Sequence, residues 1–252
     1  MSSGLANIDL VEILFTLFWV FFIGLVLYLH RESKREGYPL VSDRSKHVTV
    51  QGFPAIPPAK EYKLYHGGTQ LAPRDEAPEV DVPGKPVGKS PGYPLDPVGD
   101  PIGANLGPGA YAHRSDTPDL TIDGHPRVVP MRANASLHVD PRDPDPRGWP
   151  VTAADGVQVG TIKDAWIDLS EPMIYYLEMD AGDRSVIIPF HFADVDKAKS
   201  EIRVDVLYSH QFANAPSLKS PDQITLLEED KITGYFAGGL MYADDKRGEP
   251  LI

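Results

Sequence analysis

The side chains of this sequence that could do chemistry are mostly acids, and they gather in short stretches. Carboxylates that lie close together raise one another's pKa and titrate as a set, so such groups can relay protons near neutral pH. Taken alone, acidic residues in turns are usually solvated surface, and that alternative stays open. The three clusters are Asp116, Asp119, Asp123, His125 and Arg127; Asp164, Asp168, Glu171 and Glu178; and Glu228, Glu229 and Asp230.

Other chemistry finds no support in the sequence. There is no phosphate-binding G-x-x-x-x-G-K-[ST], no H-E-x-x-H zinc motif and no G-x-S-x-G nucleophile turn. The chain has no cysteine, which excludes disulfides, thiolate nucleophiles and iron–sulfur ligands. We therefore expect neither a catalytic centre nor a metal site, and an anchored enzyme with an unrecognised site is the least favoured alternative.

A long apolar run near the start must position the rest of the chain. Residues 8–29 carry only two charges, Asp9 and Glu12, both at the beginning. A helix of that length reaches about 33 Å, enough to cross the hydrocarbon core of a bilayer. The first residues, MSSGLANID, hold no Lys or Arg, and no small-residue cleavage site follows the run. The pattern favours a membrane span over a cleaved signal peptide.

Basic residues follow the run and none precedes it. Arg31, Lys34 and Arg35 come directly after it, so the positive-inside rule predicts that everything after residue 30 is cytoplasmic. Together with Tyr38 they are our candidates for contact with the membrane surface or lipids. Residues 30–66 hold seven basic and four acidic side chains, although the net charge of the chain is −12. A basic collar suits anionic headgroups, whereas an acidic body would repel nucleic acid.

Residues 66–110 are rich in Pro and Gly. Proline fixes its own φ and withholds a backbone donor, so this segment cannot build a helix or the interior of a sheet. A disordered linker is one interpretation. The other, which we favour, is an ordered arm laid over partner surfaces, because apolar residues recur every few positions from Leu71 to Tyr111.

From Arg127 onward, short β-rich runs alternate with turn signals such as Asp155-Gly156 and Ala181-Gly182-Asp183, which predicts a small antiparallel sheet or barrel. Near the end, Thr225 and Glu228 form a capping-box pattern. A short helix is expected after it, with Ile232, Phe236 and Leu240 on one face and two glycines, Gly234 and Gly238, on another, where backbones could approach closely.

Four motifs together carry a resemblance. They are REGYPL at 35–40, GDP at 99–101, DGH at 123–125 and, above all, LLEEDKITGYFAGGLMYA from Leu226 to Ala243. With the N-terminal span and the Pro/Gly arm they closely resemble the H subunit of the photosynthetic reaction centre of purple bacteria, a member of the PRC-barrel family.

The resemblance implies three regions: a periplasmic N-terminus and transmembrane helix over 1–36, an extended arm over 37–110, and a mainly antiparallel β domain of PRC-barrel type with a short C-terminal helix over 111–252. It implies a single-pass protein of the inner (chromatophore) membrane, with its main domain in the cytoplasm. Its partners would be the L and M subunits, membrane lipids and the light-harvesting 1 antenna subunits. This chain would bind no cofactor alone, since bacteriochlorophyll, bacteriopheophytin, quinones and non-haem iron lie in the partners.

The resemblance also gives the acidic clusters a role. Reducing a buried quinone needs protons that arrive along groups able to gain and lose them. By motif, the proton-path candidates are Asp123 and His125 at the entry, Glu171 further along, and Asp168 as a nearby acid. Arg127 stands where related subunits carry a second His, and Tyr175 where a related subunit carries Arg, so the entry and the charge around Glu171 differ here. The competing function is a membrane-anchored PRC-barrel scaffold or assembly protein without a role in electron transfer.

Overall fold

The computed structural model describes residues 9–41, 49–73, 83–90 and 93–248, and the structural statements below concern these residues. The first eight residues, to which the periplasmic prediction applies, lie outside them. Contacts divide the chain into two compact units, which we describe separately. One comprises Met1–Ala77 and Ser90–Gly92, and the other comprises Pro78–Lys89 and Tyr93–Ile252.

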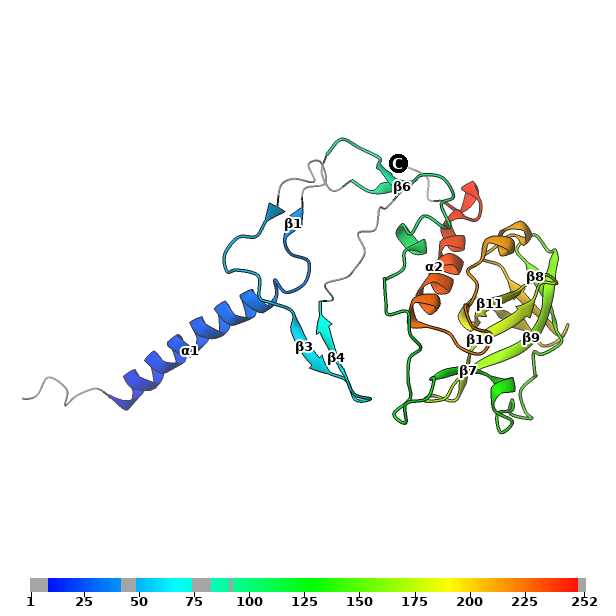
Figure 1. Ribbon diagram of the computed structural model, residues 1–252. Helices are drawn as coiled ribbons and strands as arrows, with labels where there is room; N and C mark the ends of the chain where they lie inside the picture. The colour runs from blue at the N-terminus through cyan, green and yellow to red at the C-terminus, as the bar shows by residue number, and fades with distance from the viewer. Residues whose placement is uncertain (1–8, 42–48, 74–82, 91–92, 249–252) are drawn as a thin grey trace, which may run out of the picture. The chain divides into compact units, whose positions relative to one another are not determined.

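The first unit begins with helix α1, Leu10–Glu32, which confirms the predicted single apolar helix (Figure 1). Asp9 caps it by accepting a hydrogen bond of 3.3 Å from the Val11 amide. No residue of α1 is buried within the chain, and the helix is long and apolar enough to be a candidate membrane span. Its apolar surface therefore needs lipid or partner helices around it.

The described part of the arm over 37–110 contains no α-helix, as its prolines and glycines predict. It forms three two-stranded antiparallel sheets and one 3-10 turn. In the first unit these are β1 (Leu40–Val41) with β2 (Thr49–Val50) and β3 (Lys60–Lys63) with β4 (Thr69–Ala72); in the second they are β5 (Gly84–Pro86) with β6 (Leu95–Pro97), followed by η1 (Gly107–Gly109).

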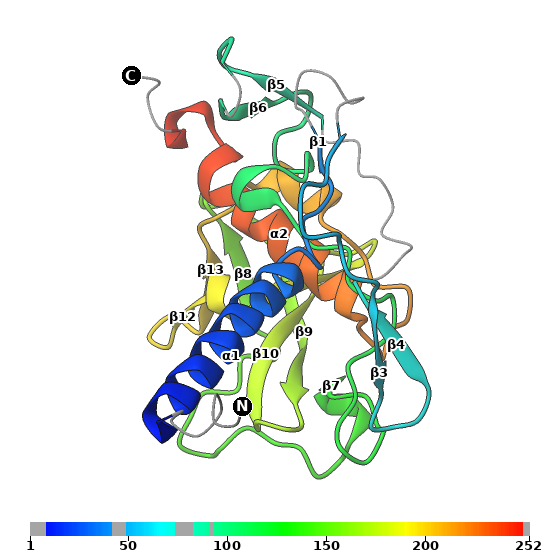
Figure 2. The ribbon, with the colours of Figure 1, turned by 90° about the vertical axis from the view of Figure 1, so that its left-hand side faces the viewer.

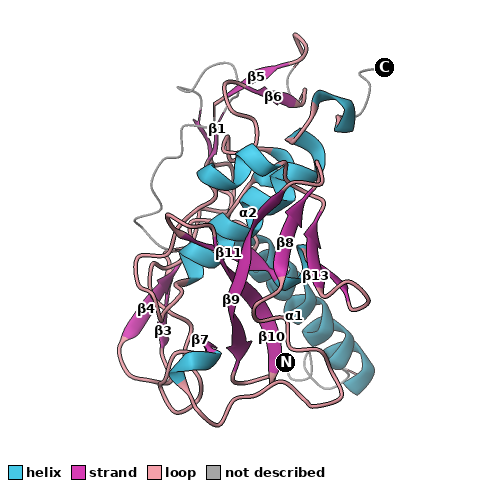
Figure 3. Ribbon diagram, turned by 90° about the vertical axis from the view of Figure 1, so that its right-hand side faces the viewer, coloured by secondary structure: helices cyan, strands magenta, loops and turns pink. Residues whose placement is uncertain are grey.

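The predicted β domain is a seven-stranded sheet in the second unit (Figure 3). The strands lie in the order β11-β10-β9-β8-β13-β12, with β7 also paired to β9. All pairs are antiparallel except β8 with β13, so the sheet is mainly antiparallel as expected. The strands are β7 (Val128–Pro130), β8 (Pro150–Ala153), β9 (Gln158–Asp168), β10 (Met173–Asp180), β11 (Ser185–Pro189), β12 (Asp194–Asp196) and β13 (Glu201–Val204); the 3-10 turns are η2 (Met131–Ala133), η3 (Phe190–Phe192), η4 (Ser209–Asn214) and η5 (Asp245–Arg247).

The surroundings of strand β9 explain why apolar and polar residues alternate only in part of its sequence. Its second half, Asp164–Asp168, is buried on both faces, and β7 and β10 both pair with it at Trp166. Trp166 is fully buried at the centre of the apolar core. Two acids in this stretch are thereby taken out of water, and they need charged partners.

Helix α2, Leu226–Tyr242, closes the domain and confirms the capping box. The Thr225 hydroxyl accepts from the Glu228 amide at 3.2 Å, and the Glu228 carboxylate accepts from the Thr225 amide at 2.9 Å. Ile232 and Phe236 are fully buried, as predicted. Leu240, which shares their spacing, is 54% exposed, so this face is buried only at Ile232 and Phe236.

Gly234 and Gly238 of α2 do allow close approach. A Cβ at Gly238 would lie 3.2 Å from the Ile102 carbonyl oxygen and 3.2 Å from the Gly109 Cα, and one at Gly234 would lie 3.0 Å from the Gly109 carbonyl oxygen. The end of the arm therefore lies directly on the backbone of α2, beside η1. Residues 102–111 therefore pack against the helix backbone at these two glycines, which we call the glycine seat.

Candidate functional site

The predicted entry residues lie on a tight turn in the second unit. Leu120 and Pro126 close it as an isolated antiparallel bridge, and the His125 carbonyl accepts a 2.8 Å hydrogen bond from the Thr121 amide. Asp123 and His125 are both exposed on this turn. Their side chains are therefore open to solvent.

Arg127 holds the base of this turn. Its amide donates to the Asp119 carbonyl at 2.8 Å, and its guanidinium pairs with the Asp119 carboxylate at 3.3 Å and with Asp168 at 2.6 Å. Arg127 stands where the resembled motif has its second His. Its two ion pairs join the turn to the end of β9.

Asp168 is only 1% exposed and accepts hydrogen bonds from the amides of Ser170 at 2.8 Å and Glu171 at 3.2 Å. Burial raises the pKa of the Asp168 carboxyl, but Arg127 and the two amides outweigh burial and hold the pKa below its usual value. Asp168 therefore stays a carboxylate at neutral pH. It orients the 168–171 turn, while Glu171 itself lies exposed beside Pro172.

A second acid, Glu229, lies in a cleft. It was not among the proton-path candidates from the sequence. The cleft, of about 400 Å³, lies between β10 and α2. In it, the Tyr176 hydroxyl donates to the Glu229 carboxylate at 3.0 Å. Burial raises the pKa of Glu229, and the charges of Asp119 and Asp230 add to this, while Tyr176 and Arg114 only partly oppose it. Glu229 is thus the acid of this surface whose surroundings favour the protonated form.

Other titratable side chains surround Glu229. His191 lines the same cleft, and burial lowers the pKa of its imidazole. Arg114 lies 3.4 Å from Asp230. Because Asp119 both pairs with Arg127 and acts on Glu229, the entry turn, Asp168 and the cleft form one electrostatically connected group.

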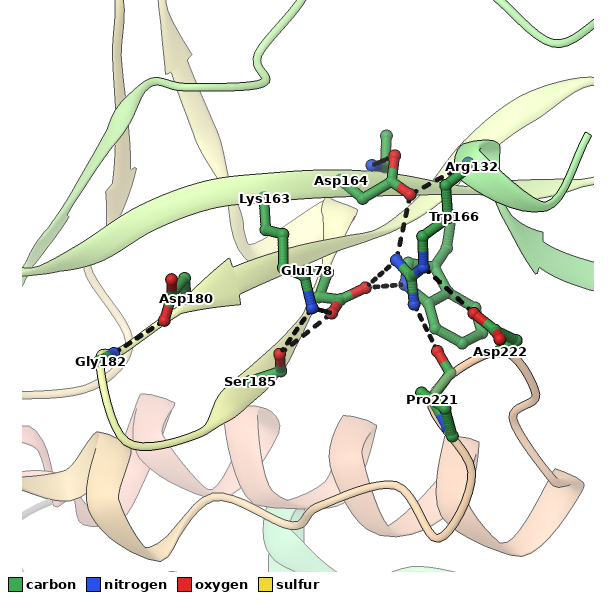
Figure 4. A network of polar contacts seen from close by, with 11 residues as sticks. Arg132, Lys163, Asp164, Trp166, Glu178, Asp180, Gly182, Ser185, Pro221 and Asp222 are labelled. Carbon is green, nitrogen blue, oxygen red and sulfur yellow. Dashed lines mark hydrogen bonds and ion pairs between the residues drawn. The ribbon is translucent and has the colours of Figure 1, made fainter. Parts of the chain in front are cut away.

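The remaining buried acids belong to a structural network around Arg132 (Figure 4). Its guanidinium lies 3.1 Å from Asp164, 2.5 Å from Glu178 and 3.1 Å from Asp222, and also donates to the Pro221 carbonyl. Three segments meet at this one side chain: η2, the paired strands β9 and β10, and the loop before α2.

Glu178 is the acid most enclosed by this network. It also receives hydrogen bonds from Lys163 at 2.8 Å, Ser185 at 3.0 Å and the Trp166 indole at 3.1 Å. Burial raises the pKa of the Glu178 carboxyl, but Lys163, Arg132 and Trp166 together bring it below its usual value. Glu178 and Asp164, which the sequence placed with the relay acids, are therefore partners in the core.

The basic residues after α1 divide into two kinds. The Lys34 ammonium is buried and donates to the carbonyls of Gln51 at 2.9 Å and Pro54 at 3.0 Å, with the Tyr38 ring 5.3 Å away. Arg35 pairs with Glu32 at 2.8 Å. These contacts fix the chain where it leaves α1, and Arg31 is the exposed basic side chain of the three.

Within the described ranges, no three His, Asp, Glu or Cys side chains are grouped so that they could hold a metal ion. Sequence reasoning missed Arg132, Tyr176 and His191, and it named Glu229 only as a member of an acidic run. The partners of Arg132 lie at residues 164, 178 and 222, so only the strand register brings them together. The capping box indicated the role of Glu228, but no local signal distinguished the neighbouring Glu229.

Two family comparisons cover these elements. The N-terminal region of the photosynthetic reaction centre H-chain matches residues 3–133, and the PRC-barrel domain matches residues 141–211. The first match includes α1, the arm and the entry turn, and it covers more than half of the 252 residues. The second covers the sheet from β8 to β13. The chain therefore belongs to the family of photosynthetic reaction centre H-chains, which are membrane-associated subunits with a PRC-barrel domain.

Proposed function

We propose that this chain caps the L and M subunits on the cytoplasmic side, stabilises the quinone region and conducts protons to the secondary quinone. It acts as an accessory subunit of a light-driven quinone-reducing complex, whose pigments, quinones and non-haem iron belong to the partners. Family membership supports the place in the complex. The observation that carries the proton role is the connected group of the entry turn, Asp119 and Glu229.

The path begins at Asp123 and His125, which are open to water. Asp168 and Arg127 do not exchange protons near neutral pH, because each stabilises the charged form of the other. They instead hold the turn that carries Glu171, whose amide donates to Asp168. Glu229, whose pKa is raised by burial, is suited to pass a proton towards a quinone that becomes more basic when it is reduced.

The test compares Glu171→Gln and Glu229→Gln in the native complex, since Gln keeps the shape and removes the titrating proton. Flash-induced first electron transfer to the secondary quinone should be unchanged. The proton-coupled second transfer should slow across pH 6 to 9; a tenfold slowing corresponds to about 1.4 kcal/mol of added barrier.

Glu201→Gln is the matched control, because Glu201 is a carboxylate of β13 that pairs with Thr152. Its kinetics should equal those of the native complex. Unchanged second-transfer kinetics in both test variants would remove these two acids from the path. The scaffold alternative predicts in addition that the native chain purifies without near-infrared-absorbing pigment, whereas the proposed function requires such pigment in the native complex and a colourless isolated chain.

The cytoplasmic orientation is part of the same proposal, and the basic residues after α1 support it. Protease added to right-side-out cells should leave the β domain intact. Digestion of that domain under these conditions would reverse the proposed topology.

A further inference from the structure

The β3–β4 hairpin of the first unit exposes aromatic and apolar side chains. Tyr62 is 52% exposed, Tyr65 79%, Leu64 47% and Leu71 42%. A two-stranded hairpin without a core beneath it is at best marginally stable in water. These side chains therefore call for a surface that covers them.

The base of this hairpin is tied to the end of α1. The Lys60 ammonium, at the first residue of β3, lies 2.7 Å from the carboxylate of Glu32, the last residue of α1. Arg35 pairs with the same carboxylate at 2.8 Å and donates to the Pro58 carbonyl. Figures 1 and 2 both show that the hairpin begins close to where α1 ends.

This tie sets the depth of the hairpin relative to a bilayer. The 23 residues of α1 reach about 34 Å, whereas the hydrocarbon core is about 30 Å thick. When α1 spans the membrane, Glu32 lies among the headgroups. Lys60 lies within an ion-pair distance of it, so the hairpin starts at the same level.

The composition of the hairpin suits that level. Tyrosine is enriched at membrane interfaces, where its ring contacts acyl chains and its hydroxyl stays hydrated. Lys60 and Lys63 face only one acid within β3, Glu61, although the whole chain carries −12. Lysines near the surface of anionic lipid are attracted to it.

We propose that the β3–β4 hairpin lies on the headgroup layer of the membrane that α1 crosses, and that its tyrosines and lysines contact anionic phospholipids. The hairpin is then a second attachment of the chain to lipid, lateral to the span. This role is independent of proton conduction, since it requires only that α1 is inserted.

The chain has no native cysteine, so a nitroxide can be placed at one site through Tyr65→Cys. The full chain is labelled, assembled with its partner subunits and placed in nanodiscs of phosphatidylcholine with phosphatidylglycerol. Collisions with oxygen should exceed collisions with a water-soluble nickel chelate, which is the signature of lipid contact. Discs of phosphatidylcholine alone, or the added change Lys63→Gln, should weaken this preference severalfold.

Two results would overturn the proposal. Frequent collisions with the nickel chelate would place Tyr65 in water, and few collisions with either reagent would place it against a partner protein. A label introduced by Lys85→Cys, in the exposed hairpin β5–β6, is the matched control. Equal lipid contact at both labels would show that the tie between Lys60 and Glu32 does not determine the contact, and would also overturn the proposal.

Discussion

Replacing Arg132 by Met should destabilise the β domain more than loss of any exposed ion pair. The change keeps a long apolar stem and removes the guanidinium that joins η2, the β9–β10 pair and the loop before α2 (Figure 4). Asp164 and Glu178 are each 3% exposed, so both carboxylates would remain buried with fewer partners.

The expected loss of stability depends on the partners that the two buried carboxylates keep. Removing one partner of a buried ion pair costs about 3–5 kcal/mol. Lys163, Ser185 and Trp166 still donate to Glu178, and the Arg132 side chain is itself 33% exposed, which favours the lower end. We expect a loss of about 3 kcal/mol, or roughly 6–12 °C in the unfolding midpoint of a domain of this size.

The assay is thermal unfolding of the full chain in detergent, followed by near-ultraviolet circular dichroism, which also reports the packing of Trp166. Lys197→Met is the control, because Lys197 pairs with Asp143 at 3.8 Å with both side chains 66% exposed; it should cost under about 1 kcal/mol. Adding Glu178→Gln to Arg132→Met should recover part of the loss, as coupled neighbours do. A loss below about 1 kcal/mol for Arg132→Met would refute the assignment of this network as a buried clamp.

Three further changes test other parts of the structure. The folded-state pKa of Glu229 is raised, so the contribution of Glu229 to the free energy of unfolding is favourable below the unfolded pKa and is lost as pH rises through the folded pKa. Glu229→Gln should therefore raise the unfolding midpoint at pH 8 and leave it nearly unchanged at pH 4. An equal shift at both pH values would contradict this. The folded-state pKa of Asp168 is lowered, so its contribution is present above the unfolded pKa and is lost as pH falls through the folded value; Asp168→Asn should lower the midpoint at pH 7 and lower it less at pH 3, as measured by the same unfolding scan. In Gly239→Ala the new Cβ would overlap the Val206 carbonyl oxygen, which should cost about 1–3 kcal/mol, whereas Gly24→Ala, with nothing within 4 Å, should be neutral in a denaturant titration; equal stability of the two variants would show that α2 can move away.

Local signals in the sequence predicted the elements well because each signal acts over a few residues. The apolar run predicted α1, and the capping box at Thr225 placed the start of α2 at the next residue. The β-rich texture after Arg127 predicted the sheet. Helical spacing alone does not say where the buried part of a face ends, and here the exposed Leu240 lies in the last turn of α2.

The environments of the acids were not predictable in the same way. Asp164 and Asp168 follow a strand pattern with imperfect alternation, and nothing local distinguishes a solvated acid from one paired across the sheet. Their burial depends on the register of β7 and β10 against β9, and Arg127 and Arg132, which pair with them, come from other parts of the chain. Glu229 differs from its neighbour Glu228 only through the direction in which the helix turns it, toward Tyr176 rather than toward the cap.

The glycine seat on α2 has a consequence for the order in which the protein is made. The arm segment at Ile102 and Gly109 emerges from the ribosome long before Gly234 and Gly238, and a contact between such distant parts of a chain forms late. The arm segment at residues 102–109 therefore stays without the surface on which it packs until α2 has been synthesised, and this part of the arm can reach its final place only after the domain that follows it in the sequence has folded.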